Sequence, residues 1–471
     1  MGRSEDSQRR AEQARLAEQR LREHGVRVIQ MEMPDINGTV RGKVASMHKG
    51  LAPAGTGMSS LIMSFRGGEE ITISPWSDVD NGFPKISAVP DLSTLIQWPW
   101  RPDTAAVLCD FVMDDGSPCD MDVREILRRA VAELAELGLS AQAAIEWELY
   151  IYESDDELLR AGRYRELKCL GRNLHCYTLT NYPSFTPLAT DFLTRMESVG
   201  IEVEAFHSEY GRGQYEFTCA PADPMTAADW AVRAKTYLRQ VAAEHGLVTT
   251  WMPVLHTGTL DAHSGAHVNL SLCRDGRNLF WDADRGGLSD LARHAAAGIM
   301  ATMADFHLMF RPWVNSFRRM DRLSWNPEDA SWGLDNHGAA IRVVHGPDPA
   351  RYTRFEHRAP GPDVNPYLAL AAIIFGAARG VRDRMEPPPQ AVGDPIAAGG
   401  YQLLPRTLAD SVDTLRSSPV AKDLLGQAFI EHFSAMKLDE SRAYLAWLAE
   451  NPEVSPDQVT DWEFRNYFEW A

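Results

Sequence analysis

Polar and hydrophobic side chains alternate along residues 143–152, which read AAIEWELYIY. A period of two is typical of a β-strand, because successive side chains of a strand point to opposite faces. Glu146 and Glu148 therefore share one face, whereas Ile145, Trp147 and Leu149 share the other. The pattern predicts a strand with one hydrophobic face and one face that presents two carboxylates.

Three further segments are also predicted to be strands with one polar face. They are residues 214–219, which follow the glycines of the EYGRGQYE segment, residues 267–272 and residues 354–358. A single strand of this kind is ordinary in an antiparallel sheet, whose outer face is often solvated. Four such strands indicate a shared polar site instead. Its candidate side chains are those of Glu209, Glu216, His267, Asn269, Ser271, Arg354, Glu356 and Arg358.

The acidic members of this set predict a metal site. Carboxylate oxygens with one imidazole nitrogen suit Mg²⁺ or Mn²⁺, whereas a structural zinc site favours thiolates. Five carboxylates nearly balance two divalent ions, which leaves arginines free to bind an anionic substrate or a nucleotide. We therefore expect a two-metal site for phosphoryl transfer. The ligand candidates are Glu146, Glu148, Glu209, Glu216, His267 and Glu356, and the arginines are Arg319, Arg342, Arg354 and Arg358.

Helical and strand-like patterns divide the chain into three parts. Residues 1–24 have the composition of a surface helix that Gly25 ends. Residues 25–112 contain short alternating runs separated by turn residues, which predicts a small strand-rich domain. Residues 113–471 begin with a helical pattern from Val123 to Leu137 and end with helices after Leu408. We expect an α+β protein with a larger second domain.

The overall composition excludes several classes of protein. A chain of 471 residues exceeds the roughly 250–300 residues that one hydrophobic core supports. The net charge of −18 makes nucleic acid a poor partner. No apolar stretch reaches the about 20 residues of a membrane-spanning helix, and the N-terminus is charged. Six cysteines without a C-x-x-C pair fit reduced thiols, so we expect a cytoplasmic protein with neither membrane nor nucleic acid as a partner.

Several motifs in order along the chain resemble the glutamine synthetase family, the ATP-dependent carboxylate–amine ligases. The resemblance runs from NGTVRGK at residues 37–43 to VTDWE at residues 459–463. Its most specific parts are E-x-G-x-G-Q-x-E ending at Glu216, HSGAH ending at His267, NSFRR ending at Arg319, AAIRV around Arg342, and R-x-E-x-R ending at Arg358. It implies a β-grasp N-terminal domain and a catalytic domain whose curved antiparallel sheet lines the active site. It also implies stacked homo-oligomeric rings with active sites between subunits.

The resemblance assigns roles to individual positions. It makes Glu148, Glu209 and Glu216 the ligands of one Mg²⁺ or Mn²⁺ ion, and Glu146, His267 and Glu356 the ligands of the other. Arg319 and Arg358 would hold the acid substrate or its acyl phosphate, and Arg342 and Arg354 would address the transferring phosphate of ATP. The catalytic set is thus Arg319, Arg342 and Arg358. ATP would also contact Asn269, Ser271 and His337, and the substrates would contact His263, Gly265 and Trp325.

Departures from the family pattern bear on the amine substrate. Ammonia-using members have a flap glutamate six residues after the arginine that matches Arg319, and here that residue is Trp325. They also take an aspartate from the neighbouring subunit, whereas the matching residues 57–68 contain no acid. An ammonium ion without these partners would be disfavoured by several kcal/mol, more than a cation–π contact restores. The sequence therefore predicts an organic amine, with Trp325 lining its pocket; a structural role for Trp325 within the flap is the alternative.

Other departures lie in the glutamate and nucleotide pockets. Ala262 and His263 replace an Asn-Gly pair that contacts glutamate, and His337 replaces an arginine. Asn269 replaces the second histidine of H-x-H, and Pro221 replaces an adenine-stacking aromatic residue. We expect an ATP-dependent ligase that forms γ-glutamyl amides. The alternatives are the same chemistry on a different acid, a non-catalytic structural or regulatory member, and, if the resemblance is set aside, a two-metal phosphohydrolase.

Overall fold

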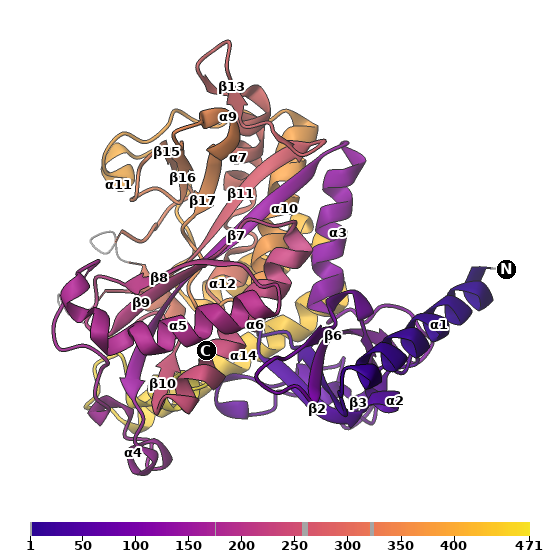
Figure 1. Ribbon diagram of the computed structural model, residues 1–471. Helices are drawn as coiled ribbons and strands as arrows, with labels where there is room; N and C mark the ends of the chain where they lie inside the picture. Colours follow the sequence, from indigo (N-terminus) through magenta and orange to yellow (C-terminus); the bar gives the residue numbers. More distant parts are fainter. Residues whose placement is uncertain (1, 175, 257–261, 321–324) are drawn as a thin grey trace.

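The computed structural model describes residues 2–174, 176–256, 262–320 and 325–471. Helix α1 (Gly2–Glu23) begins the chain and lies at the edge of the molecule, with its N-terminal end pointing away from the body (Figure 1). Ala14 and Leu21 are its buried residues among those whose side chains are described. A surface helix was expected here, and its limited burial fits that expectation.

The N-terminal sheet has six strands in the order β2-β1-β6-β4-β3, with β5 paired to β6. The central pair β1–β6 is parallel, and the other pairs are antiparallel. The strand-rich N-terminal part is therefore confirmed, whereas its more specific description as a β-grasp domain and the boundary at residue 112 stay predictions. The strands are β1 (Val28–Pro34), β2 (Val40–Ser46), β3 (Thr56–Ser59), β4 (Lys85–Pro90), β5 (Ile96–Gln97) and β6 (Thr104–Met113).

The second sheet has nine strands, seven of them in the order β15-β16-β17-β11-β7-β9-β8. Strand β10 pairs with β7 and β12 pairs with β11, and all pairs are antiparallel except β15–β16. All four segments predicted to be polar-faced strands lie in this sheet. The strands are β7 (Ser140–Glu153), β8 (Val203–Ser208), β9 (Gln214–Cys219), β10 (Leu247–Thr250), β11 (Ala266–Arg274), β12 (Arg277–Asn278), β15 (Trp332–Leu334), β16 (Ile341–Val344) and β17 (Arg354–His357).

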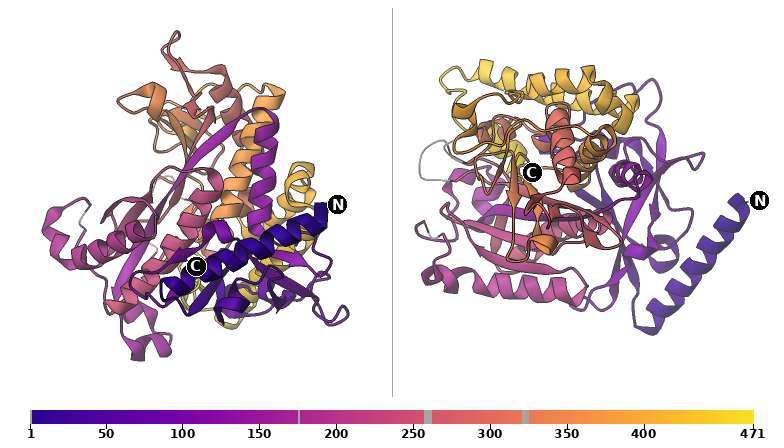
Figure 2. Two further views of the ribbon diagram at one scale, coloured as in Figure 1. Left: turned by 45° about the vertical axis from the view of Figure 1, so that its right-hand side comes forward. Right: turned by 90° about the horizontal axis from the view of Figure 1, so that it is seen from above.

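Long helices pack beside this sheet and form the core with it (Figures 1 and 2). Helix α10 contacts both α3 and α7, and α6 contacts β7 and β10. The α7–α10 contact is close because it is built on glycines: a Cβ on Gly298 would lie 2.1 Å from the carbonyl oxygen of Gly376. These helices are α3 (Val123–Glu136), α5 (Tyr182–Ser198), α6 (Pro224–Glu244), α7 (Asp290–Thr302) and α10 (Pro366–Asp383).

Helices also form the C-terminal segment, as its pattern predicts. They are α12 (Leu408–Ser417), α13 (Pro419–Leu425), α14 (Gln427–Glu450) and α15 (Asp461–Tyr467). The described chain also contains short elements, which include α2 (Met47–Gly50), α4 (Asp156–Arg160), α8 (His307–Phe310), α9 (Pro349–Tyr352), α11 (Pro395–Ala398), and the hairpin of β13 (Trp281–Asp282) and β14 (Gly287–Leu288).

One buried ion pair and two hydrogen bonds join the N-terminal sheet to the larger part of the chain. Arg233 on α6 donates to Glu32 on β1 at 2.7 Å, and the hydroxyl of Tyr237 donates to the other carboxylate oxygen at 2.6 Å. Lys437 on α14 donates to Asn37 at 3.1 Å. Breaking such a buried pair leaves an uncompensated charge, so these contacts fix how the two parts dock.

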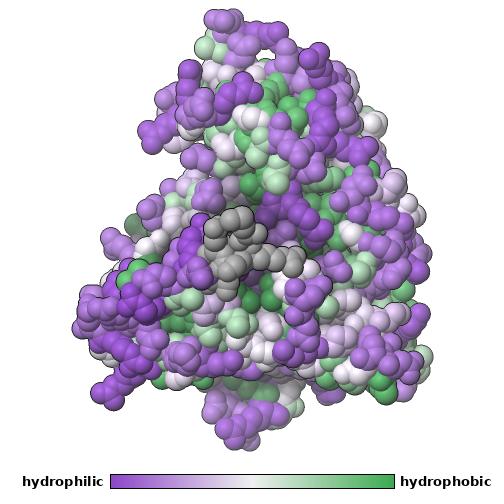
Figure 3. Space-filling view, turned by 90° about the vertical axis from the view of Figure 1, so that its right-hand side faces the viewer, coloured by the Kyte–Doolittle hydropathy of each residue, from purple (hydrophilic) through white to green (hydrophobic). Residues whose placement is uncertain are grey.

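The hydrophobic face of β7 explains why its other face is available for chemistry. Trp147 is fully buried and packs edge-on against Trp251 with ring centroids 5.7 Å apart. Ile145 and Leu149 are buried beside it, as the period of two predicts. Glu146 and Glu148 point to the opposite side, so burial of the tryptophan face fixes their direction. The face of the molecule shown in Figure 3 is mainly hydrophilic. Among the described residues, no helix has the length and apolar character needed to cross a membrane.

Candidate active site

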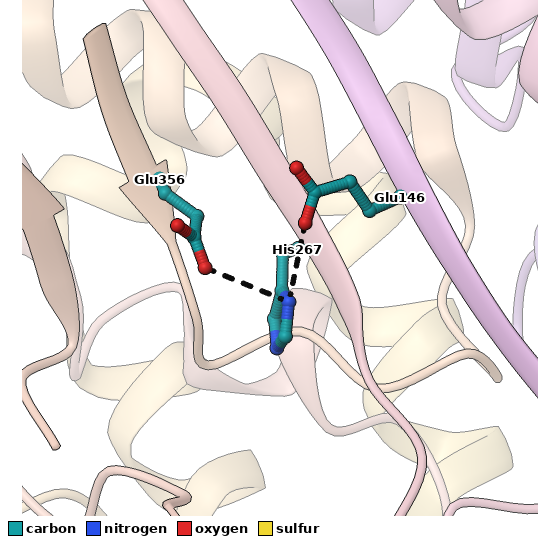
Figure 4. A group of neighbouring side chains, drawn as sticks. All are labelled: Glu146, His267 and Glu356. Atoms are coloured by element: carbon teal, nitrogen blue, oxygen red, sulfur yellow. Dashed lines mark ion pairs between the residues drawn. The ribbon is translucent and has the colours of Figure 1, made fainter. Parts of the chain in front are cut away.

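Glu146, His267 and Glu356 form one compact group, here called the His267 cluster. They lie on the adjacent strands β7, β11 and β17, and His267 stands directly opposite Glu146 in the strand register. The Nδ1 atom of His267 is 3.5 Å from Glu146 and 3.6 Å from Glu356. Both carboxylates point toward this nitrogen (Figure 4). The predicted sharing of one polar face therefore brings these three side chains together.

Arginines surround the His267 cluster. Arg342 on β16 donates to Glu356 at 2.8 Å, and Arg358 makes a short contact with the other oxygen of the same carboxylate. Burial would raise the pKa of Glu356, but the surrounding positive charge, including Arg358 and Arg342 hydrogen-bonded to its carboxylate, outweighs burial and lowers that pKa to about 2. Burial and Arg358 hold the pKa of His267 well below its usual value, so its imidazole is neutral at physiological pH. A neutral imidazole offers a lone pair to a metal ion.

A second group consists of His207, Glu209 and Glu216, here called the His207 cluster. His207 on β8 is paired with Glu216 on β9, and Glu209 follows the end of β8. The His207 Nδ1 atom lies 3.7 Å from Glu209, and its Nε2 atom lies 3.6 Å from Glu216. Burial and Glu216 raise the pKa of Glu209, whereas the raised pKa of His207 reflects both carboxylates, which outweigh the opposing effect of burial.

Glu148 lies between the two clusters. It is paired with Glu216 across β7 and β9, and its Oε1 atom is 3.9 Å from Nδ1 of His267. Its Oε2 atom accepts hydrogen bonds from the backbone N–H of Gly265 at 2.8 Å and from Gln214 at 3.1 Å. Burial, with Glu216 next in effect, raises the pKa of Glu148 to about 8. A nearby cation would favour the ionised form of this carboxyl group and lower its pKa.

The spacing of the His267 cluster fits a divalent ion. Two ligands about 2.1 Å from one ion lie roughly 3.0–3.5 Å apart when their bonds form angles of 90–110°. In the His267 cluster, both distances are measured from Nδ1 of His267, and at 3.5 and 3.6 Å they are close to this range. In the His207 cluster, Glu209 faces Nδ1 and Glu216 faces Nε2, so His207 lies between the two carboxylates. The ligand atoms of each cluster also lie within 4.8 Å of one another. The carboxylate-rich donor sets suit Mg²⁺ or Mn²⁺, as the sequence predicts.

Asn269 connects the His267 cluster to Arg354. Its side-chain N–H donates to Glu146 at 2.8 Å, and its side-chain oxygen accepts from Nε of Arg354 at 2.8 Å. The amide orientation is fixed because only its nitrogen can donate to the carboxylate and only its oxygen can accept from the guanidinium. Ser271 lies two residues further along the same face of β11. These residues form the border of the carboxylate site toward the candidate phosphate-binding arginines.

Arg319 and Gly265 lie against the His267 ring. The Nη2 atom of Arg319 is 3.5 Å from Nε2 of His267, and a Cβ on Gly265 would lie 2.6 Å from that same Nη2 atom. Glycine is therefore required for this close approach. His263 is half-buried nearby in sequence, and His337 is exposed, with its backbone oxygen accepting from Arg358 at 3.0 Å. Burial and Arg342 lower the pKa of His337, so it is expected to be neutral.

Trp325 packs edge-on against Tyr210, with ring centroids 5.9 Å apart and an interplanar angle of 83°. Tyr210 directly follows Glu209 of the His207 cluster. Trp325 has a φ of 57°, in the left-handed region that bulky residues rarely adopt. About half of its surface remains exposed. The two rings thus form an aromatic wall beside the His207 cluster.

Comparisons with known proteins agree with this arrangement. Residues 120–467 match the family model described as glutamine synthetase, catalytic domain. The chain belongs to the glutamine synthetase family. Its catalytic domain makes it an ATP-dependent acid–amine ligase, so the non-catalytic and phosphohydrolase alternatives are not supported.

Individual relatives of this glutamine synthetase family member cover 84–95% of its length. A glutamate–isopropylamine ligase from a Pseudomonas species is 30% identical over 462 residues, which are 95% of this chain and 96% of that protein. The gamma-glutamylethanolamide synthetase GlnA4 of Streptomyces coelicolor is 32% identical over 84% of this chain and 81% of that protein. The crystal structure of a novel glutamine synthase homolog superposes with a TM-score of 0.78 at 26% identity and covers 94% of this chain and 99% of the other.

Sequence reasoning did not find two residues of the candidate active site. His207 forms an H-x-E pair with Glu209, and this spacing could have indicated it, but the predicted motif began at Glu209. Tyr177 lies in a loop, and its ring packs against that of His207 with centroids 4.7 Å apart. No local pattern around Tyr177 predicts this contact, because it depends on how the loop folds back onto β8. The roles assigned to the other site residues of this family member stay proposals.

Proposed function

We propose that this enzyme uses ATP to activate the γ-carboxylate of glutamate and joins it to an organic amine, giving a γ-glutamyl amide. The aromatic wall of Trp325 and Tyr210 carries the proposal, because it stands beside the carboxylate site where ammonia-using members have a glutamate. The names of the relatives that act on isopropylamine and ethanolamine support the same substrate class.

The proposed reaction has two steps. A substrate carboxylate oxygen attacks the γ-phosphorus of ATP, the bond to ADP breaks, and an acyl phosphate forms. The neutral amine nitrogen then attacks the acyl carbon, phosphate leaves, and the amine loses a proton to water. Divalent ions bound by the two clusters would neutralise charge on the transferring phosphoryl group.

The arginines are proposed to bind the phosphoryl group and the acid. Arg342 and Arg358 converge on Glu356, so their remaining N–H groups lie beside the proposed metal ligands. Arg354 is held by Asn269 at the neighbouring position. Arginine can donate two parallel hydrogen bonds to the oxygens of a phosphate or a carboxylate. This geometry favours a role in binding the substrates over a role limited to neutralising the glutamates. Arg319 approaches the same site from the side of Gly265 and is proposed to hold the acid.

The choice of amine follows from charge. Trp325 provides no carboxylate for an ammonium ion, and residues 57–68 contain no acid. Desolvating a small cation without a partner costs several kcal/mol, whereas burying an alkyl group contributes about 0.8 kcal/mol per CH₂. The pocket should therefore prefer amines with an apolar substituent to both ammonia and polyamines.

A panel of amines tests the proposal. ADP release is measured with glutamate, Mg²⁺ or Mn²⁺, and either ammonium, methylamine, isopropylamine, ethanolamine, phenethylamine or putrescine, and products are identified by mass spectrometry. We expect glutamate-dependent ADP release with at least one alkyl- or arylamine and little with ammonium. Rapid turnover with ammonium and none with any organic amine would reject the assignment.

A different acid is the second candidate, favoured by Ala262 and His263 at positions where family members contact glutamate. The carbonyl oxygen of Ala262 accepts from Tyr150 at 2.6 Å, so the loop is held by its backbone at this point. Replacing glutamate with aspartate, 2-oxoglutarate or short dicarboxylates in the same assay separates the candidates. ADP release that needs one of these acids and not glutamate would favour the second.

Ring assembly is also part of the proposal. The N-terminal part exposes the hydrophobic residues Ile71, Ile73 and Val79, which suits a contact with another subunit. Active sites would then lie between neighbouring subunits, as the family resemblance implies. Mass photometry should show a large homo-oligomer, and a monomer at micromolar concentration would contradict this assembly.

A further inference from the structure

We propose that Asp363 is a positioning residue for the two arginines assigned to the acid substrate. Arg358 begins the loop of residues 358–365, which follows β17, and Arg319 ends the 3₁₀ helix η6 (Asn315–Arg319). Asp363 joins this loop to this helix. The inference rests on the proposed function and extends it, because neither the strand pattern nor the family resemblance assigns a role to Asp363.

The carboxylate of Asp363 is tied to η6 by Ser316. The Ser316 hydroxyl donates to Oδ2 of Asp363 at 2.5 Å and accepts from the backbone N–H of Trp313 at 2.9 Å. The indole N–H of Trp313 in turn donates to the backbone oxygen of Asp363 at 3.2 Å. Asp363 is 2% exposed and Ser316 is fully buried, so water does not compete for these hydrogen bonds. The loop and the helix are therefore held together as one unit.

Arg319 is bound by the backbone of the same loop. Its Nη1 atom donates to the backbone oxygen of Arg358 at 3.1 Å and to that of Ala359 at 3.0 Å. Its Nη2 atom lies 3.5 Å from Nε2 of His267. The direction of the Arg319 guanidinium therefore depends on where the loop lies, and Asp363 is a residue that fixes the loop.

Gly361 provides the space that the carboxylate occupies. A Cβ on Gly361 would lie 2.5 Å from Oδ1 of Asp363, whereas the next nearest group, Pro253, would be 3.3 Å away. The backbone of Gly361 does not have a positive φ, so its conformation does not require glycine. The close approach of the carboxylate does require it. A methyl group at this position would push Asp363 away from its present place.

Charge gives Asp363 a second effect on Arg319. Burial raises the pKa of Asp363 to about 6, and the hydrogen bond from Ser316 and the charge of Arg319 act against burial. The carboxylate is therefore ionised above neutral pH. Arg319 is 1% exposed, and a nearby carboxylate offsets part of the cost of burying its guanidinium.

Three substitutions separate the hydrogen bond, the charge and the space. Ser316→Ala removes the donor to the carboxylate, Asp363→Asn keeps an acceptor oxygen but removes the charge, and Gly361→Ala fills the space. Ser316→Ala and Asp363→Asn change little volume, so both should fold. For each full-length variant in its native oligomeric state, steady-state kinetics are measured with the acid and ATP varied in turn. Tm and backbone hydrogen exchange of residues 313–319 and 358–365 are measured in parallel.

Two matched controls change buried groups elsewhere. Ser434→Ala removes a buried hydroxyl on α14 that has no hydrogen-bond partner among the described residues. Asp229→Asn changes a buried carboxylate on α6 that accepts from Arg124 at 2.9 Å and from Tyr367 at 2.7 Å. Asp229→Asn should lower Tm without raising KM for the acid, which separates a loss of stability from a loss of positioning.

KM for the acid should rise by about 10- to 100-fold in Ser316→Ala and Gly361→Ala while KM for ATP stays within about twofold, because misplacing a binding group by about 1 Å can cost this much. Asp363→Asn should have a smaller effect, since it keeps the acceptor. Hydrogen exchange in both segments should become faster in all three variants and stay unchanged in Ser434→Ala.

A double variant tests whether Gly361 and Asp363 act as a pair. Gly361→Ala should raise KM for the acid much less in the Asp363→Ala background than in the wild-type enzyme, because the carboxylate that it displaces is already absent. Additive effects, or equal changes in KM for the acid and for ATP with unchanged exchange, would overturn the role of Asp363 and leave the proposed function intact. A wild-type enzyme that releases no ADP with any acid and amine would overturn both.

Discussion

The two clusters share one polar sheet face but differ in the charges around them. In the His267 cluster, Glu356 is held by Arg342 and Arg358, and its pKa is lowered to about 2. In the His207 cluster, no lysine or arginine of the described chain pairs with Glu209 or Glu216, and burial raises the pKa of Glu209. The first cluster is rich in compensating positive charge, and the second is not.

Because of this difference, the charge around the carboxylates changes from one side of the sheet to the other. Carboxylates already matched by arginines can bind a metal ion and still present N–H groups to an anion such as phosphate. Carboxylates without arginines attract cations, which suits a metal ion. Charge therefore changes from the β16–β17 side, where the arginines lie, to the β8–β9 side, where Tyr210 and Trp325 form the aromatic wall.

Of the substitutions considered, replacing Glu356 should reduce activity the most. Glu356→Ala removes a proposed metal ligand and the shared partner of the buried Arg358 and the partly buried Arg342, so we expect activity to fall by on the order of 10³-fold or more. ADP release and Mn²⁺ calorimetry measure the change. Glu204→Ala, which alters an exposed glutamate on β8, is the control and should stay within about twofold. Substantial activity in Glu356→Ala would place the metal site elsewhere.

Asn269→Ala should weaken the use of ATP on the arginine-rich side of the sheet and leave amine binding largely unchanged. The substitution removes one hydrogen bond to Glu146 and one from Arg354, both charge-assisted, and each contributes about 1.5–3 kcal/mol. We expect kcat/KM for ATP to fall by about 10- to 100-fold while KM for the amine changes little. Steady-state kinetics with each substrate varied in turn separates the two. An equal loss for both substrates would show that Asn269 supports the whole site instead of Arg354.

Trp325→Ala should affect amine binding on the β8–β9 side of the sheet. Loss of the ring removes apolar area from the proposed amine pocket and the contact with Tyr210, so KM for the preferred amine should rise by about tenfold and KM for ATP should not. Tyr352→Ala, which removes another exposed aromatic ring, is the control. Trp325→Glu should in turn raise turnover with ammonium, because it supplies the missing carboxylate. Unchanged amine kinetics in Trp325→Ala would leave that residue with a packing role.

The sequence predicts the polar face well because strand periodicity is a local property. Once Trp147 and Phe355 are recognised as buried, the directions of Glu146 and Glu356 follow from the period of two. The division of the acids into two clusters could not be predicted in this way. It depends on the register that places His207 opposite Glu216 and His267 opposite Glu146. That register is set by contacts between strands far apart in the chain.

For the fold as well, the sequence predicts local elements but not the pairing of segments far apart in the chain. Helical patterns at residues 123–137 and in the C-terminal segment correspond to α3 and α12–α15, because amphipathic periodicity is also local. The parallel pairing of β1 with β6, and of β15 with β16, is not visible in any short segment. The docking of Arg233 onto Glu32 joins residues 201 positions apart, so only the folded chain reveals it.

The stability of the metal-free enzyme should depend on pH through Glu148. This is the smallest of the effects predicted here. Burial raises the pKa of Glu148 from 4.5 to about 8, so the folded state holds a proton that the unfolded state has released between these pH values. Stability therefore falls as pH rises from about 4.5 to 8. The Tm of EDTA-treated enzyme should drop by a few degrees from pH 6 to pH 8, to about the extent expected from one such group. Glu148→Gln should flatten this slope, and Mn²⁺ should remove it in the wild-type enzyme by occupying the site. A slope that persists in Glu148→Gln would assign the protonation change to other groups.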